Sequence, residues 1–181
     1  MLSASAHKIG GPKGVGFLYV REGIKISPWL FGGGQENGMR SGTENTTGIV
    51  GFAKALEEVK KIKINKIKRL KEKFSTELEK IGGKINSSSG GIYNIIHASF
   101  LKLNGENIVY WLSEKKIYIS TGSACDSRKR KEDYVLRAIG LKDSEIDGSV
   151  RISLNENTTE ADLKFLLSEL KKILRNQKVF A

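Results

Sequence analysis

Apolar residues in the middle of the chain recur three or four positions apart, which is the period of an amphipathic helix. The recurring residues are Ile49, Phe52, Ala53, Leu56 and Val59 in one set, and Ile67, Leu70, Phe74, Leu78 and Ile81 in a second. The phase changes between Ile62 and Ile67, within a basic stretch, and Gly82 with Gly83 is expected to end the second set. The pattern predicts two helices, or one bent helix, joining two subdomains with a boundary near this change of phase.

Shorter segments on either side alternate between strand and helix signals. Strands are expected over Val15–Val20, Ile92–Leu103, Ile117–Thr121 and Ser149–Leu154. Helices are expected over Glu106–Lys116 and Glu132–Ile139, and a last helix should begin at Thr159, where Asp162 completes a capping-box pattern. Its expected buried face is Leu163, Leu166, Leu167, Leu170 and Leu174. Interleaved strands and helices predict a small layered α/β or α+β unit.

The glycine-rich segment Gly32–Gly42 has no period and is expected to be a loop. Glycines let the backbone approach a ligand or another chain closely, although a flexible surface excursion would have the same composition. Glu36, Arg40 and Thr43 in and beside this segment favour a site.

Composition narrows the class of protein. An apolar content of 39% fits a globular chain, no apolar run reaches the length of a membrane span, and no secretory signal is recognisable. The single cysteine cannot form an internal disulfide, which fits a reducing cytoplasm. The net charge of +11 is concentrated in Lys54–Lys84. No aromatic residues alternate with these cations to stack bases, so a solvated helix face is favoured over a nucleic-acid-binding surface.

The string Ser5-Ala-His-Lys-Ile-Gly-Gly-Pro-Lys-Gly14 places Lys8 on a tight turn beside His7. A surface turn is the ordinary interpretation of glycine and proline in this arrangement. The alternative is a lysine that attaches pyridoxal phosphate as a Schiff base, with hydroxyl and imidazole groups nearby to bind the phosphate.

Cys125 ends the segment Ser120-Thr-Gly-Ser-Ala-Cys125, and four consecutive cations follow at 128–131. A lone cysteine is most often a small buried apolar residue. Small polar neighbours predict an exposed loop instead, and the cations would favour the thiolate, which is the nucleophile.

Four segments, in their order and at their spacing, resemble the pyridoxal-phosphate-dependent cysteine desulfurases of the iron–sulfur-cluster type, which are class-V aminotransferase-like enzymes. The segments are Ser5–Gly14, Gly32–Asn45, Ser120–Cys125 and Ser149–Leu154. The resemblance covers nearly the whole chain but only the C-terminal half of the family's length. It implies the C-terminal portion of a fold-type I transferase. Residues 1–65 would be a remnant of the large cofactor domain with the lysine loop and long helix, and residues 66–181 the small domain.

The resemblance also implies roles for residues around the cofactor. Lys8 would attach pyridoxal 5′-phosphate, and Ser5 and His7 would help to bind its phosphate. Thr43 would reach the phosphate of a partner subunit's cofactor, which implies a homodimer. The family's ring-stacking residue, its aspartate at the pyridine nitrogen and its glycine–threonine phosphate loop have no counterpart in this chain. The chain alone is therefore expected to be a poor enzyme or none.

For substrate and product, the resemblance implies that Arg151 grips the carboxylate of L-cysteine. Cys125 would take the sulfur as a persulfide and pass it to an acceptor or scaffold protein, leaving L-alanine. His97 stands where the family usually has asparagine or a similar polar residue, and it is interpreted as a strand residue, not a ligand. With one cysteine and two histidines no metal site is expected. A non-catalytic sulfur carrier or docking module, and a basic nucleic-acid-binding protein, remain as alternatives.

Overall fold

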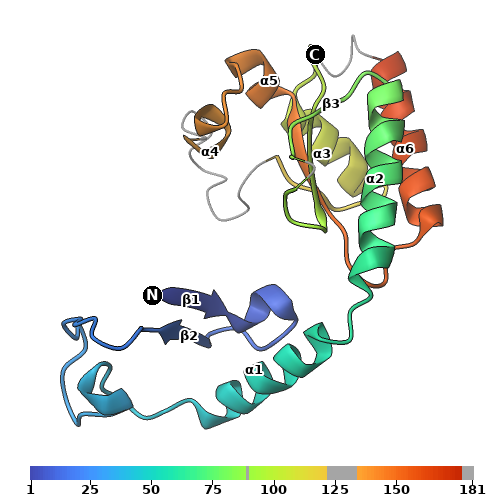
Figure 1. Ribbon diagram of the computed structural model, residues 1–181. Coiled ribbons are helices and arrows are strands. Elements are labelled where there is room, and N and C mark those ends of the chain that lie inside the picture. Colours follow the sequence, from blue (N-terminus) through green and yellow to red (C-terminus); the bar gives the residue numbers. More distant parts are fainter. Residues whose placement is uncertain (89, 122–133, 177–181) are drawn as a thin grey trace. The chain divides into compact units, whose positions relative to one another are not determined.

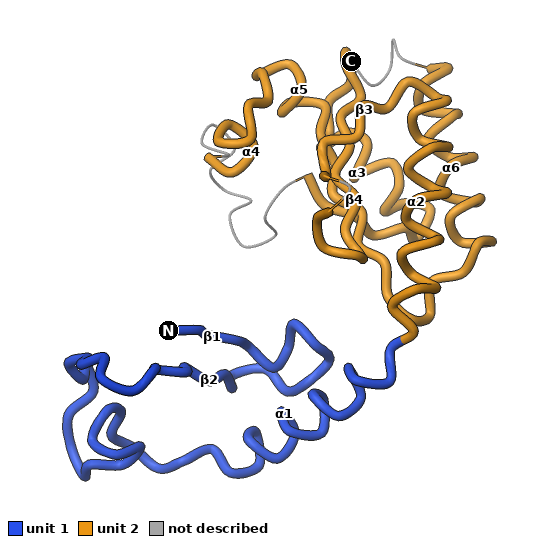
Figure 2. Tube along the Cα trace, in the orientation of Figure 1, with its two compact units in different colours: residues 1–62 blue, residues 63–181 orange. Residues whose placement is uncertain are grey.

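The computed structural model describes residues 1–88, 90–121 and 134–176 of the chain. The chain divides into two compact units, residues 1–62 and residues 63–181 (Figure 2). That residues 1–65 are a remnant of a large cofactor domain and residues 66–181 the small domain stays a prediction. Among the described helices, none is long and apolar enough to cross a membrane.

The first unit is built from a two-stranded hairpin and one long helix. Strand β1 (Leu2–Ser5) pairs antiparallel with β2 (Gly16–Tyr19), and the 3₁₀ turn η1 (Ala6–Ile9) lies between them. A second 3₁₀ turn, η2 (Glu36–Gly38), lies in the glycine-rich loop, and helix α1 (Thr46–Val59) ends the unit. The predicted strand at Val15–Val20 is thus present, and its partner strand β1 was not foreseen.

Few apolar side chains are buried in the first unit. Its buried apolar residues are Ala6, Phe52 and Ala55, whereas Trp29 is 92% exposed and Phe31 is 83% exposed. On α1 the predicted apolar face is only partly covered, because Phe52 packs against Phe17 with ring centroids 5.6 Å apart while Ile49 remains exposed. Isolated hairpins are marginal without a packed face, so the first unit has little core of its own.

The second unit contains a three-stranded antiparallel sheet in the order β3-β4-β5. Its elements run α2 (Ile64–Lys80), β3 (Lys84–Ile85), β4 (Ile95–Ser99), α3 (Gly105–Glu114), α4 (Tyr134–Ala138), α5 (Asp143–Asp147), β5 (Ser149–Ser153) and α6 (Glu160–Arg175) (Figure 1). Helix α2 packs against β3, β4 and α6, and α3 packs against β5 and α6. These three helices form one layer against the sheet.

Alternation along the strands separates an apolar face from a polar face. Ile96 and Ala98 of β4, with Val150 and Ile152 of β5, are buried on the helix side. The residues between them point to the other face, where Ser99 contacts α5. His97 and Arg151 are half-buried there.

The helical predictions hold in their main features. The apolar pattern forms two helices, α1 and α2, and Gly82 with a φ of 92° ends the second as its N–H donates to the carbonyl of Glu79. Thr159 and Asp162 form the predicted capping box of α6. On that helix Ile173 is buried, and Leu174, which was expected to be buried, is only half-buried.

Two other expectations are wrong. The strand predicted at Ile117–Thr121 is reduced to a single bridge between Ser120 and Arg151. On α1, Ala53 was expected in the apolar face but is exposed, and Ala55 is buried instead. Helix α5 had no apolar period to reveal it, because its five residues are too few to show one.

Candidate functional site

The lysine loop folds back on itself through backbone hydrogen bonds. The N–H of Ala6 donates to the carbonyl of Val15 at 3.0 Å, and the N–H of Gly11 donates to the carbonyl of Ala6 at 2.9 Å. Gly10 ends η1 with a φ of 83°, a conformation that glycine adopts without steric cost. These bonds hold the turn that carries Lys8 in a defined shape.

Small residues let this loop lie directly on α1. A Cβ at Gly11 would come within 2.9 Å of the Cβ of Ala6 and 3.2 Å of the Cβ of Ala55, and one at Gly51 would come within 2.6 Å of the Cγ of Pro12. Ala6 is fully buried at this contact, so packing against α1 holds the loop in place. The helix therefore serves as the support for the loop.

The three predicted cofactor residues of this loop are exposed. Ser5 is the last residue of β1, and His7 and Lys8 lie in η1. They bring a hydroxyl, an imidazole and an amine into four consecutive residues, with no acidic residue in the turn. This donor set fits pyridoxal phosphate, because the hydroxyl and imidazole are suitable phosphate donors and the amine is available for covalent attachment.

Thr43 lies in the irregular segment before α1 and is exposed. The glycine-rich loop is closed by bonds among its own residues. The N–H of Gly42 donates to Oε1 of Gln35 at 3.0 Å, and the N–H of Ser41 donates to the carbonyl of Leu30 at 3.2 Å. Asn45 then caps α1 by accepting from the N–H of Gly48 at 3.0 Å. Thr43 is thus placed between a closed loop and a capped helix.

Arg151 occupies the middle of β5, on the polar face of the sheet. Its N–H donates to the carbonyl of Ser120 at 2.6 Å and its carbonyl accepts from the N–H of Ser120 at 3.2 Å. Ser120 opens the segment that leads to Cys125, so the bridge brings the start of that segment beside Arg151. Cys125 itself lies outside the described residues.

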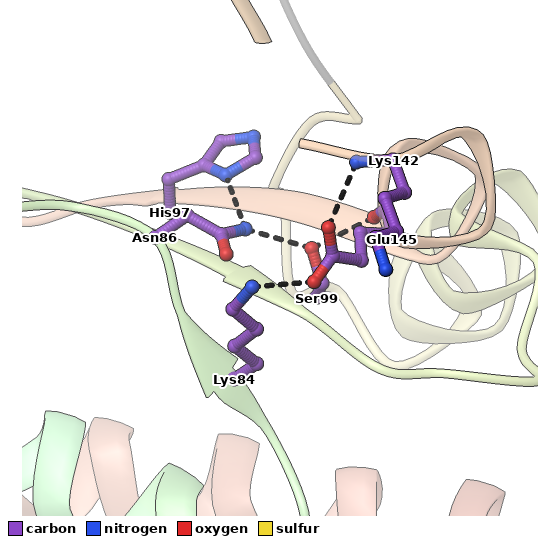
Figure 3. Close-up of polar contacts among 6 residues, drawn as sticks. All are labelled: Lys84, Asn86, His97, Ser99, Lys142 and Glu145. Atoms are coloured by element: carbon purple, nitrogen blue, oxygen red, sulfur yellow. Dashed lines mark hydrogen bonds and ion pairs between the residues drawn. The ribbon is translucent and has the colours of Figure 1, made fainter. Parts of the chain in front are cut away.

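A polar cluster on the same face of the sheet was not foreseen from the sequence (Figure 3). Asn86 contacts both His97 and Ser99, and Ser99 donates to the carbonyl of Glu145 at 2.7 Å. The carboxylate of Glu145 binds the ammonium of Lys84, and this bond is the main cause that lowers the pKa of Glu145 from its ordinary value. His97 and Ser99, two polar residues two positions apart in β4, were the available signal, but only the sheet register shows what they face.

Of the predicted site residues, Ser5, His7 and Lys8 lie together in one turn of the first unit, and Thr43 lies in the segment before α1. Arg151 lies in the second unit, beside Ser120 at the start of the segment that leads to Cys125. Among residues 1–88, 90–121 and 134–176, no group of three histidine, cysteine, aspartate or glutamate side chains is arranged to hold a metal ion.

Comparison with known proteins places this chain in a family. Residues 1–166 match the family model described as aminotransferase class-V. The chain belongs to the class-V aminotransferase family. The resemblance inferred from the four sequence segments is therefore confirmed. The cysteine desulfurases of this family depend on pyridoxal phosphate.

Similar curated proteins of the family are cysteine desulfurases. The chain is 41% identical over 181 residues to the cysteine desulfurase IscS of Dictyoglomus turgidum, covering 96% of this chain and 46% of that protein. It is 37% identical over 179 residues to the cysteine desulfurase IscS 1 of Archaeoglobus fulgidus, with 96% and 47% covered. The chain thus spans about half the length of the curated relatives it matches.

Solved structures agree on the fold. A NifS-like protein superposes with a TM-score of 0.83 at 35% identity, covering 96% of this chain and 46% of that one. A NifS-like protein from Rickettsia africae superposes with a TM-score of 0.81 at 28% identity, with 96% and 47% covered. The expected α/β fold, as part of a fold-type I enzyme, is confirmed.

Proposed function

We propose that this chain is the C-terminal half of a pyridoxal-phosphate-dependent cysteine desulfurase. The complete reaction converts L-cysteine to L-alanine and retains the sulfur as a persulfide on Cys125 for transfer to an acceptor protein. The observation that carries the proposal is the match over 96% of the chain to cysteine desulfurases, of which it spans 46%.

The exposed apolar surface of the first unit supports the view that this chain alone is inactive. Trp29, Phe31 and Leu30 are exposed, and only three apolar residues of the unit are buried. In a complete enzyme the missing half would cover such a surface and supply the remaining groups around the cofactor. The chain without that half is expected to show no turnover of L-cysteine.

The lysine loop is assigned to the cofactor. Lys8 would attach pyridoxal phosphate, Ser5 and His7 would donate hydrogen bonds to its phosphate, and Thr43 would contact the cofactor of a second subunit in a homodimer. When bound, the cofactor supplies the electron sink that allows the carbon–sulfur bond of L-cysteine to break. The anchored loop on α1 keeps the amine and the phosphate donors in one place.

Substrate and sulfur are assigned to the second unit. Arg151 would bind the substrate carboxylate, for which a guanidinium is well shaped. Cys125 would accept the sulfur, so that a sulfur–sulfur bond forms as the carbon–sulfur bond breaks. The following cations at 128–131 would hold the thiol as thiolate and attract an acidic sulfur acceptor or scaffold protein. We place this chemistry in the cytoplasm.

The decisive experiment is chemical trapping of the cofactor. The full chain is incubated with pyridoxal phosphate, reduced with borohydride and mapped by peptide mass spectrometry. Modification is expected at Lys8, and Lys8→Ala should abolish it while Lys13→Ala, an exposed lysine in the same loop, should not. Equal labelling of many surface lysines, with none preferred, would refute the assignment of the loop.

A second experiment separates the desulfurase half from a sulfur carrier that uses no cofactor. Alkylation of Cys125 at neutral pH is expected to be faster than that of a free thiol and to slow as salt is added, since salt screens the neighbouring cations. A reactive Cys125 combined with no trapping at Lys8 would favour the carrier. A Cys125 that is unreactive and insensitive to salt would contradict both.

A further inference from the structure

A directed series of hydrogen bonds runs from α5 to the ring of His97 (Figure 3). The carbonyl of Glu145 can only accept, so the hydroxyl of Ser99, 2.7 Å away, must donate to it. The oxygen of Ser99 is then the acceptor for Nδ2 of Asn86, also at 2.7 Å. The direction of each bond follows from the one before it.

The same series decides which ring nitrogen of His97 carries a proton. Nδ2 of Asn86 has a second N–H, and it faces Nδ1 of His97 at 3.1 Å. Nδ1 must therefore accept, and the proton of the neutral ring lies on Nε2. The backbone of His97 is held as well, because its N–H donates to the hydroxyl of Ser87 at 2.8 Å.

His97 lies directly across the sheet from Arg151. The backbone groups of His97 bond to Ser87 and Asn86 on one side, and those of Arg151 bond to Ser120 on the other. The two residues therefore form a non-hydrogen-bonded pair, in which facing side chains approach most closely, with Cα atoms about 4.5 Å apart. Nε of Arg151 is buried at this place, although the side chain as a whole is half-buried.

We infer that His97 is a positioning residue for Arg151. The hydrogen bonds from Glu145 through Ser99 and Asn86 hold the imidazole uncharged and in one orientation, so that it packs beside the guanidinium as a neutral neighbour. Arg151 is thereby kept with Nε shielded and its terminal nitrogens directed to a ligand. That the ligand is the carboxylate of L-cysteine rests on the proposed function.

Nuclear magnetic resonance of the ¹⁵N-labelled full chain tests the first step. Only two histidines are present, so His97→Asn assigns the ring signals. At neutral pH we expect an unprotonated Nδ1 and a protonated Nε2 for His97. Asn86→Asp, which replaces the donor by an acceptor, should move a proton to Nδ1. Asn107→Asp makes the same charge change at an exposed site and should leave the signals unchanged.

Solvent exchange of the Arg151 Nε–H tests the second step, with Arg151→Lys for assignment. Exchange should be slow in the wild type and about tenfold faster in His97→Ala and in Asn86→Asp, because the shielding contact is lost or displaced. His97→Asn keeps an uncharged acceptor at the δ position and should restore slow exchange. Unchanged backbone signals of α3 and α6 show that the unit remains folded.

The inference is overturned if Nδ1 of His97 is protonated in the wild type, or if neither His97→Ala nor Asn86→Asp changes the exchange. If His97→Ala fails to fold, the exchange rates of the Arg151 Nε–H in Asn86→Asp and His97→Asn are compared instead. Addition of L-alanine, the carboxylate product, reports on the proposed function separately. A wild-type Arg151 signal that does not respond to L-alanine but still depends on His97 would support the positioning contact and show that this chain alone does not bind the carboxylate.

Discussion

Glu169 offers a test of how burial changes the contribution of an ion pair. It lies on α6, is only 2% exposed, and accepts a hydrogen bond from Lys172 at 2.6 Å, one turn along the helix. The hydrogen bond from Lys172 lowers the pKa of Glu169 from its ordinary value, burial opposes this, and the indole N–H of Trp111 and the charge of Lys115 add to the lowering. Glu169→Gln keeps the shape of the side chain and removes its charge.

The expected loss of stability follows from these contacts. A hydrogen bond to a charged group contributes about 1.5–3 kcal/mol. Lys172 is 59% exposed, so solvent screens part of the pair and the expected destabilisation is about 1–2 kcal/mol. Glu77→Gln is the matched control, because Glu77 pairs with Lys80 at 2.7 Å with the same helical spacing but on the surface. The loss of folding stability in Glu77→Gln should be smaller than that in Glu169→Gln.

The pH dependence has a definite sign. A carboxylate whose pKa is lower in the folded than in the unfolded chain stabilises the fold above the unfolded pKa of about 4.3, and this contribution is lost as the pH falls through the folded pKa. Wild type and Glu169→Gln should therefore differ most at neutral pH and converge in acid. This pH dependence arises because Lys172 and Trp111 donate hydrogen bonds that favour the charged form of the Glu169 carboxyl group.

Urea unfolding followed by tryptophan fluorescence measures this difference. In a Trp29→Phe background Trp111 is the only indole, and it reports on the α3–α6 contact. The midpoint is compared for wild type, Glu169→Gln and Glu77→Gln at neutral and acid pH. A Glu169→Gln variant as stable as the wild type at neutral pH, or a difference in stability that persists in acid, would contradict a stabilising role of the Glu169 charge.

Three further outcomes are expected. Asn104→Ala should destabilise the second unit by about 1 kcal/mol in urea unfolding, because Asn104 caps α3 by accepting from two backbone N–H groups at 2.9 and 3.2 Å, whereas Asn107→Ala should have little effect. Leu78→Ala should cost about 2–5 kcal/mol by the same measurement, since Leu78 is fully buried on α2, and a smaller loss would mean that its site collapses on truncation. Limited proteolysis should cut within residues 1–45 before it cuts within residues 65–175, because the first unit buries few apolar side chains, and equal resistance of both segments would contradict this.

The lysine loop could be recognised from the sequence because its members are neighbours in the chain. Ser5, His7 and Lys8 are held together by covalent connection, whatever else the chain does. The relation of Arg151 to Ser120 and to His97 could not be recognised in this way. It depends on strand register, which is decided by pairing between segments more than 30 residues apart.

Local sequence rules determined the longer helices of this protein, whereas tertiary structure decided which strand segments pair and which side chains are buried. The capping box at Thr159 and the break near Ile62 act through neighbouring backbone groups, so the sequence alone was sufficient for them. The segment Ile117–Thr121 has the composition of a strand but forms one bridge, because a strand needs a partner along its whole edge. Glu169 has the sequence signature of a surface charge and becomes buried only because α3 packs over it, a contact between residues far apart in the chain that no local pattern encodes.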